Sequence, residues 1–291
     1  MIRAILLFGM CFMILQPILN KISVSFMAEE DLYNAMVISI PEHFTTANYQ
    51  LANQFMEYWS TLRNTLLVSF TILQIGVCTI VGYGFARFEF PLKKFWFACV
   101  IMVIIIPPQT ISTSLHLHFR YFDIFGLFNA LMGDSINLVD TNLSMYIPAL
   151  MCNGIRAGLF IYLFRQFFRG LPKELEDAAY LDGCGPFKTF ISVMVPNAAS
   201  SFLTVFIFSI VWYWNDYYFA QTMMQSQQLM STKIGTIRTL VRNMSGSWGD
   251  GYSETVYVYA AALLFILPPL ILYIIVQRFF IQSIERTGIV G

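Results

Sequence analysis

The chain has 291 residues, of which 57% are hydrophobic and only 12% are charged, and its mean hydropathy is +0.63. Soluble domains carry about 25% charged residues, so this composition indicates a protein embedded in a lipid bilayer. The 17 basic and 17 acidic side chains balance to a formal net charge of zero, which excludes the basic surface of a nucleic-acid-binding protein.

Six apolar segments are each long enough to cross about 30 Å of hydrocarbon as a helix, and they are too continuous for the alternating strands of a membrane β-barrel. They lie near residues 4–20, 65–86, 95–115, 143–164, 190–213 and 257–277. We therefore expect an all-α polytopic membrane protein whose residues 1–291 form one transmembrane domain.

Lysine and arginine give the orientation of these spans, because basic loops stay in the cytoplasm. The two ends of the chain and the second and fourth connections carry ten basic residues, whereas the three opposite connections carry six. Both termini are therefore expected in the cytoplasm. The segment near 4–20 also fits a secretory signal peptide, but no clear small-residue cleavage site follows it, so we expect a retained helix.

The span near 65–86 contains the string Thr79–Gly84, which resembles a potassium-channel filter. A filter needs its backbone unwound in a re-entrant loop, whereas this string continues a full-length span, so an ion channel is the weaker interpretation. A membrane enzyme is not favoured either, because the later spans carry almost no His, Asp or Glu in a catalytic arrangement. Nor do the five cysteines have the paired spacing of a metal site or disulfide frame.

Pro107 and Pro108 interrupt the span near 95–115 and remove backbone donors there. The polar residues that follow could line a solute path, and the candidates are Gln109, Thr110 and Thr113. A proline kink satisfied by neighbouring helices is the simpler interpretation. His116 and His118 lie just beyond, but no carboxylate or cysteine pattern completes a metal site, so we expect surface histidines and no bound metal.

Arg156 and Asn153 fall within the span near 143–164. A charge at mid-membrane costs roughly 2.5 kcal/mol or more and often marks a functional site. Arg156 could line a solute path, or it could pair with another helix or mark a shifted span boundary, and the sequence leaves these alternatives open.

A polar, helix-forming insert over residues 170–196 separates the fourth and fifth spans. Pro172 suits a first helical turn and Gly183 a left-handed stop, so we expect a short helix over about 173–182, a glycine bend, and a second helix that opens at Pro186. Leu175, Ala178, Ala179 and Asp182 would give that first helix one small, nearly flat side edged by acidic residues. Such a cytoplasmic loop is typical of a docking surface, although an amphipathic helix lying on anionic lipid is the alternative.

Aromatic residues gather at the external end of the fifth span, from Trp212 to Tyr218. We favour a membrane-interface belt, with stacking on sugar rings as the alternative. Trp214 and Asn215 remain candidates for the solute path.

The insert also carries a specific spacing: Asp177–Ala179, three residues, Gly183, nine residues, then Val193–Pro196. This pattern resembles the EAA loop of ABC importer permeases, with Asp in place of the usual Glu and Val in place of Ile and Leu. The flanking Leu171–Leu175 and Leu181–Gly183 are similar to the carbohydrate-importer branch. Further similarity to six-span, maltose-type permeases lies in Asn64–Thr65, Tyr83–Arg87, Pro107, Trp214–Asp216 and the C-terminus from Gln277.

The resemblance implies a type I ABC importer permease, a membrane subunit for a sugar or oligosaccharide in the bacterial cytoplasmic membrane; a permease for a non-sugar solute is the alternative. It also implies a second, unlike permease, two cytoplasmic ATPase subunits and an extracytoplasmic solute-binding protein. No Gly-Lys dipeptide occurs, so the chain has no Walker A site, and ATP and Mg²⁺ would bind the partner ATPases. The chain itself is then no enzyme and binds no cofactor. Its implied ATPase-coupling residues are Glu174, Asp177, Ala178, Ala179, Asp182, Gly183 and Pro196.

Overall fold

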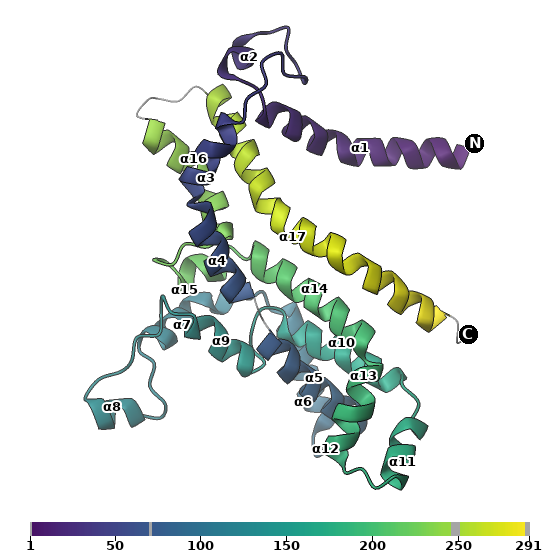
Figure 1. Ribbon diagram of the computed structural model, residues 1–291. Coiled ribbons are helices and arrows are strands. Elements are labelled where there is room, and N and C mark those ends of the chain that lie inside the picture. Colours follow the sequence, from purple (N-terminus) through teal and green to yellow (C-terminus); the bar gives the residue numbers. More distant parts are fainter. Residues whose placement is uncertain (1, 70–71, 246–250, 289–291) are drawn as a thin grey trace. The chain divides into compact units, whose positions relative to one another are not determined.

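The computed structural model describes residues 2–69, 72–245 and 251–288, which form helices joined by turns and short loops (Figure 1). Two isolated antiparallel bridges, Met27 with Phe44 and Phe122 with Ile136, are the only β pairings among these residues. The helical class that the composition predicts is therefore confirmed.

The chain divides into two compact units. The first consists of Met1–Asn64 and Gln228–Leu270, and the second of Thr65–Gln227 and Ile271–Gly291. Two helices, α4 (Tyr58–Ser69) and α17 (Gly251–Gly288), begin in the first unit and end in the second.

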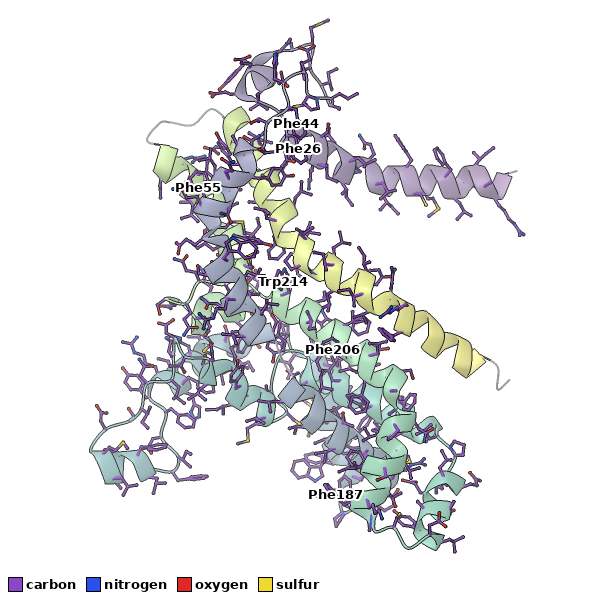
Figure 2. All side chains as sticks on the ribbon, in the orientation of Figure 1. Phe26, Phe44, Phe55, Phe187, Phe206 and Trp214 are labelled. Carbon is purple, nitrogen blue, oxygen red and sulfur yellow. The ribbon has the colours of Figure 1, made fainter. Side chains whose placement is uncertain are left out.

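In the first unit, the segment that follows its first helix folds back against the end of that helix. Its other helices are α1 (Ile2–Ser25), α2 (Glu29–Tyr33), α3 (Ala47–Met56) and α16 (Met230–Ser245). The buried Asn48 side chain donates hydrogen bonds to the carbonyls of Ser25 at 2.9 Å and Met27 at 2.8 Å. The rings of Phe26 and Phe44 stack with centroids 4.7 Å apart (Figure 2). These contacts fold residues 26–46 into a small cap at the end of α1.

This cap contains an ion pair with a predictable pH dependence. Asp31 accepts hydrogen bonds from the backbone N–H of His43 and from its ring Nδ1, each at 2.8 Å. Burial alone would raise the pKa of Asp31, but these hydrogen bonds outweigh it and hold that pKa below its ordinary 3.8. The hydrogen bond to the Asp31 carboxylate raises the pKa of His43 above its ordinary 6.5.

We expect the cap to be most stable between about pH 3.8 and pH 6.5. The Asp31 contribution is present above pH 3.8 and is lost as the pH falls through the lowered pKa; the His43 contribution is present below pH 6.5 and is lost as the pH rises through the raised pKa. Hydrogen–deuterium exchange of residues 26–46, corrected for the intrinsic pH dependence, measures this. In a His43→Gln variant the alkaline decline in protection should disappear; its persistence would contradict the assignment.

The second unit holds the larger apolar core. Its helices are α5 (Ile72–Arg87), α6 (Lys93–Ile105), α7 (Gln109–Arg120), α8 (Leu127–Met132), α9 (Leu143–Leu150), α10 (Ala157–Gly170), α11 (Glu174–Leu181), α12 (Pro186–Thr189), α13 (Val195–Asn197), α14 (Ala199–Asn215) and α15 (Tyr218–Met223), with a π-helical turn at Phe190–Met194. Phe160, Phe164 and Phe168 recur every fourth residue along α10 and are fully buried. They pack toward α5, where Gly82 leaves the backbones room to approach.

The structure interrupts several of the spans that the sequence suggests. By length and composition, three helical stretches among the described residues could cross a membrane: Arg3–Ser25, Tyr58–Arg87, which includes residues 70 and 71 outside the described part, and Glu254–Phe279. Two bent pairs raise the number to five. One is α6 with α7, bent by 101°, and the other is Pro186–Asn197 with α14, bent by 75°.

Prolines lie at the first bend and close to the second. Pro107 and Pro108 occupy the break between α6 and α7, where they cannot donate backbone hydrogen bonds. The helix over 95–115 is therefore interrupted at the two prolines, where the sequence suggests a kink. Pro196 follows the wider π-helical turn, and the helix ends at Ala198 before α14 begins. The sequence-based interpretation does not predict a bend within the span over 190–213.

The segment near 143–164 is not a continuous helix either. Residues 151–156 separate α9 from α10, and within them Cys152 and Arg156 have left-handed backbone conformations, with φ of 56° and 60°. Arg156 therefore lies at the break, directly before α10, and not inside a helix.

Candidate functional site

Residues 170–196 form a helix, a tight turn and a second helix (Figure 1), and we call them the coupling segment after the role that the resemblance implies. Gly183 follows α11 with a φ of 78°, a conformation that favours glycine. The N–H of Cys184 bonds to the carbonyl of Ala179 at 2.9 Å, and the N–H of Gly183 to that of Tyr180 at 3.0 Å. This is the Schellman arrangement, which satisfies the carbonyls at the end of a helix. The sequence predicts both the helix and its glycine stop.

The exposure of the side chains on α11 differs from the sequence-based interpretation. Glu176 and Ala179 are only 7% and 6% exposed and face the rest of the second unit, whereas Glu174, Asp177 and Ala178 are exposed. The buried Ala179 cannot be part of an outward docking side, so the expected flat face of small residues is wrong at that position. Asp182 and Pro196, the other candidates, are exposed.

Large apolar side chains are exposed on the same segment. Leu181 is 89% exposed at the end of α11, and Phe187 is 73% exposed in α12 (Figure 2). Tyr180, which precedes Leu181 in the chain, is also exposed. These residues make the turn of the coupling segment an apolar patch edged by acidic groups.

Glu176, Tyr83 and Arg87, which we call the Glu176 cluster, join α5 to α11. The Tyr83 hydroxyl donates to Glu176 Oε1 at 2.6 Å, and Arg87 Nε lies 3.0 Å from Glu176 Oε2 as an ion pair. Arg87 also donates to the backbone carbonyl of Leu171 at 2.8 Å. Glu176 was not among the candidates. The spacing of Tyr83 and Arg87, one helical turn apart on α5, was the available signal.

The break between α9 and α10 is held by a buried polar network. Gln74 on α5 donates to the carbonyl of Ile155 at 2.8 Å and accepts from the Tyr213 hydroxyl at 2.6 Å, and the N–H of Ile155 donates to that hydroxyl at 3.3 Å. A Cβ atom on Gly154 would lie 2.6 Å from Gln74 Oε1 and 2.7 Å from the Tyr213 oxygen. Only glycine fits there without a shift, so the network fixes the path of the backbone.

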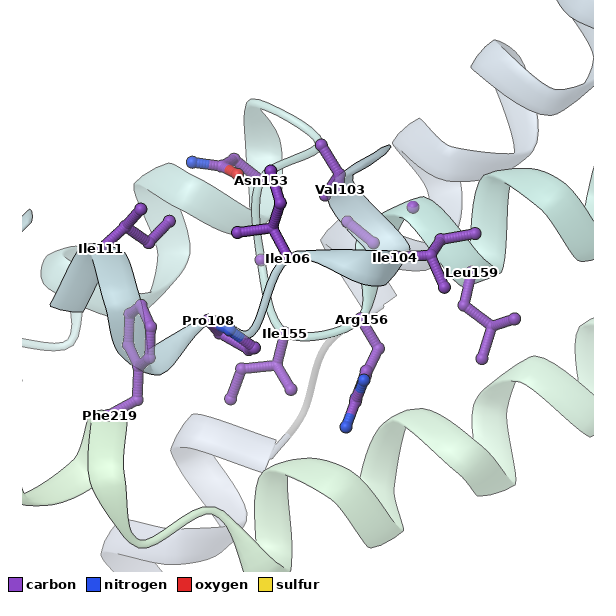
Figure 3. A pocket seen from close by; sticks show the side chains of 13 residues that line it. Val103, Ile104, Ile106, Pro108, Ile111, Asn153, Ile155, Arg156, Leu159 and Phe219 are labelled. Carbon is purple, nitrogen blue, oxygen red and sulfur yellow. The ribbon is translucent and has the colours of Figure 1, made fainter. Parts of the chain in front are cut away.

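A cavity of about 150 Å³ lies against this break (Figure 3). Its lining is mostly apolar, from α6, Pro108, α7, α10 and Phe219, together with Asn153 and Arg156. The Arg156 guanidinium carbon is 5.6 Å from the ring centroid of Trp212 on α14, within cation–π range. Among the described residues, no carboxylate forms an ion pair with Arg156.

The remaining candidates for the solute path do not join this cavity. Gln109, Thr110 and Thr113 are exposed on the first turns of α7 and are not part of its lining. Trp214 is 1% exposed, so it is a core side chain and not part of an interfacial belt. The side chain of Asn215 donates to the carbonyl of Val211 within its own helix. The structure thus brings together only Asn153 and Arg156 of that set.

A family model described as "Binding-protein-dependent transport system inner membrane component" matches residues 56–286. The chain belongs to this family of inner membrane components. As a member, it is a multi-pass membrane component of a transport system and not an enzyme. The filter-like string Thr79–Gly84 lies within the continuous helix α5, which agrees with this conclusion and not with an ion channel.

Three relatives are similar to this inner membrane component over most of its length. It is 26% identical over 280 residues to the arabinooligosaccharides transport system permease protein AraQ of Halalkalibacterium halodurans, covering 94% of this chain and 91% of the relative. It is 29% identical over 248 residues to the melibiose/raffinose/stachyose import permease protein MelC of Bacillus subtilis, covering 82% and 81%. It is 25% identical over 229 residues to the sn-glycerol-3-phosphate transport system permease protein UgpE of Shigella flexneri, covering 78% and 73%.

The fold also resembles a solved structure. A chain in the crystal structure of a bacterial ABC transporter involved in the import of the acidic polysaccharide alginate superposes with a TM-score of 0.71, covering 96% of this inner membrane component and 95% of that chain. The sequence identity is 19%, so this likeness concerns the fold alone.

Proposed function

We propose that the chain is one of two unlike membrane subunits of an ATP-driven importer for a sugar or oligosaccharide. The observation that carries the proposal is the coupling segment, whose exposed Leu181 and Phe187 form an apolar patch that is costly to leave in water. A cytoplasmic ATPase with an apolar groove would cover this patch. Glu174, Asp177 and Asp182 would surround it with acidic groups that set the orientation of docking.

In this proposal the chain crosses the cytoplasmic membrane six times, with both termini and the coupling segment in the cytoplasm. The bent pairs and the broken segment over 143–164 would each count as one pass, since irregular backbone is tolerated in a membrane where protein or a water-filled cavity surrounds it. The ten basic residues on the cytoplasmic side, against six opposite, support this orientation.

The transport cycle would proceed by alternating access. ATP and Mg²⁺ bind to two partner ATPases, whose closure moves the docked coupling segments, and the membrane helices then open the path to the outside. An extracytoplasmic binding protein delivers the solute into that path. The chain holds no nucleotide itself, because it lacks the Gly-Lys dipeptide of a Walker A loop.

The substrate class rests on relatives. Two of them are named for arabinooligosaccharides and for melibiose, raffinose and stachyose, which favours a short sugar chain. A phosphorylated polyol is the second candidate, because a relative is named for sn-glycerol-3-phosphate and because Arg156 has no carboxylate partner among the described residues. A guanidinium binds phosphate well.

Purification of the tagged chain from its native membrane in mild detergent tests the proposal. We expect a Walker-motif ATPase, a second permease and a solute-binding protein to copurify. Leu181→Asp and Phe187→Asp should each reduce the amount of ATPase recovered by about tenfold or more, because each places a charge in the centre of the proposed contact.

Leu131→Asp is the matched control, since Leu131 is 72% exposed on α8, outside the coupling segment. It should leave ATPase recovery unchanged. Full recovery of the ATPase with both the Leu181 and the Phe187 variants would rule out docking through this patch. Absence of any ATPase from the unsubstituted complex would refute the importer itself.

A further inference from the structure

The Glu176 cluster occupies both carboxylate oxygens of Glu176 from a single neighbouring helix. Tyr83 bonds to one oxygen at 2.6 Å and Arg87 lies 3.0 Å from the other. The side chains of Arg87 and Glu176 are 7% and 10% exposed, so the ion pair is largely withdrawn from water. With a contact on each oxygen, the carboxylate cannot rotate without losing one of them.

Stability alone is a weak reason for such a pair. Removing two charges from water costs several kcal/mol per ion, and an apolar pair of similar volume is often equally stable or more stable. What the Tyr83 hydrogen bond and the ion pair supply is position, because both contacts last only while α11 keeps Glu176 beside α5. The arrangement therefore specifies how α11 is positioned on α5.

Arg87 extends this positioning to the start of the coupling segment. Its Nη2 donates to the carbonyl of Leu171, directly after α10, while Glu176 lies in the first half of α11. The last turn of α5 thus holds the coupling segment at two points. Rotation of α11 about its own axis would break both contacts with Glu176.

Tyr83 connects the cluster to two further elements. Its ring centroid is 5.3 Å from that of Phe168 on α10 and 4.8 Å from that of Phe190 in the π-helical turn. Such aromatic contacts add packing to the hydrogen bond. The end of α5, the end of α10, α11 and the π-helical turn therefore meet around one tyrosine.

We propose that Glu176 is the positioning residue that makes α11 move as one body with the cytoplasmic ends of α5 and α10, so that ATPase motion reaches the membrane helices. This inference rests on the proposed function, since it needs a coupled ATPase. The exposed Leu181 and Phe187 would bind the ATPase, whereas the buried Glu176 would transmit its motion to the membrane helices. The two roles can be separated by experiment.

The test uses the assembled importer in proteoliposomes with its ATPase and binding protein, and it measures solute imported per ATP hydrolysed. Glu176→Gln should retain the ATPase at the unsubstituted stoichiometry but lower this ratio by about tenfold, because the charge-assisted contacts are lost. Tyr83→Phe should lower it by about threefold, because one hydrogen bond is lost.

Glu89→Gln is the matched control, because Glu89 forms an exposed ion pair with Lys93 near the same end of α5. It should leave the ratio unchanged, as exposed pairs contribute little. The double variant Glu176→Leu with Arg87→Met replaces the buried pair by apolar side chains and guards against misfolding of the single variant. It should assemble fully and still show the lowered ratio.

An unchanged ratio in both Glu176 variants, with the complex intact, would overturn the inference and leave the importer standing. If the unsubstituted chain recruits no ATPase, the proposed function fails first and the inference falls with it. A lowered ratio that accompanies loss of the ATPase in the double variant would also count against it, because the cluster would then serve assembly.

Discussion

Replacing Gly82 by leucine is expected to destabilise the second unit by about 3 kcal/mol and to lower its melting temperature. A Cβ atom at this position would lie 2.6 Å from Phe164 Cβ and 3.1 Å from the backbone nitrogen of Arg165. Backbone atoms cannot move aside as a flexible side chain can, so α5 and α10 would have to separate. Fluorescence-detected size-exclusion chromatography after heating measures the change.

Gly84 provides the control for this substitution. It lies two residues further along α5, and a Cβ atom there would meet nothing within 4 Å. Gly84→Leu removes the same helix-weakening glycine without the clash, and should leave stability unchanged or raise it by about 1 kcal/mol. Equal melting temperatures for the Gly82 and Gly84 variants would contradict the close helix contact.

Replacing Gln74 by leucine should be the second strongest destabilising change. The side chain is fully buried, and its loss leaves the Ile155 carbonyl without its side-chain donor and the proton of the Tyr213 hydroxyl without its acceptor. Each unsatisfied buried group costs about 1–3 kcal/mol. The backbone at 151–156 would also lose its anchor, so faster hydrogen–deuterium exchange should be confined first to this break.

Gln166→Leu is the comparison for the Gln74 variant. Gln166 is exposed on α10, and its amide bonds to the Tyr162 hydroxyl one turn away on the same helix. Its replacement should change the melting temperature little. A similar loss of stability in both variants would mean that the Gln74 network is not what holds the break.

Local signals in the sequence account for the parts of the fold that were predicted well. Apolar content gives the helical membrane class, and Pro172 and Gly183 delimit α11 because their effects act on the adjacent backbone. The family resemblance rests on the same short-range spacing. All of these features require knowledge of only a few neighbouring residues.

The breaks and the buried polar groups depend on contacts far apart in the sequence. Asn153, Gly154 and Arg156 interrupt the apolar run over 143–164, but nothing local shows that Gln74 and Tyr213 bind the backbone of Ile155 at this break. The local sequence around Glu176 likewise predicts an exposed acidic side chain. Its contacts with Tyr83 and Arg87 on α5 bury it instead. At each of these positions, contacts with residues far away in the sequence determine the structure that the local pattern does not predict.

The turn at Gly183 has a consequence for how this surface can change over time. Main-chain hydrogen bonds and one glycine close it, and a Cβ atom there would meet no neighbour within 4 Å, so glycine is favoured by its left-handed backbone and not by lack of space. Substitutions at Leu181 or Phe187 can alter affinity for a partner while α12 keeps its direction relative to α11. The side chains that a partner contacts can thus change while the turn itself keeps the same main-chain hydrogen bonds.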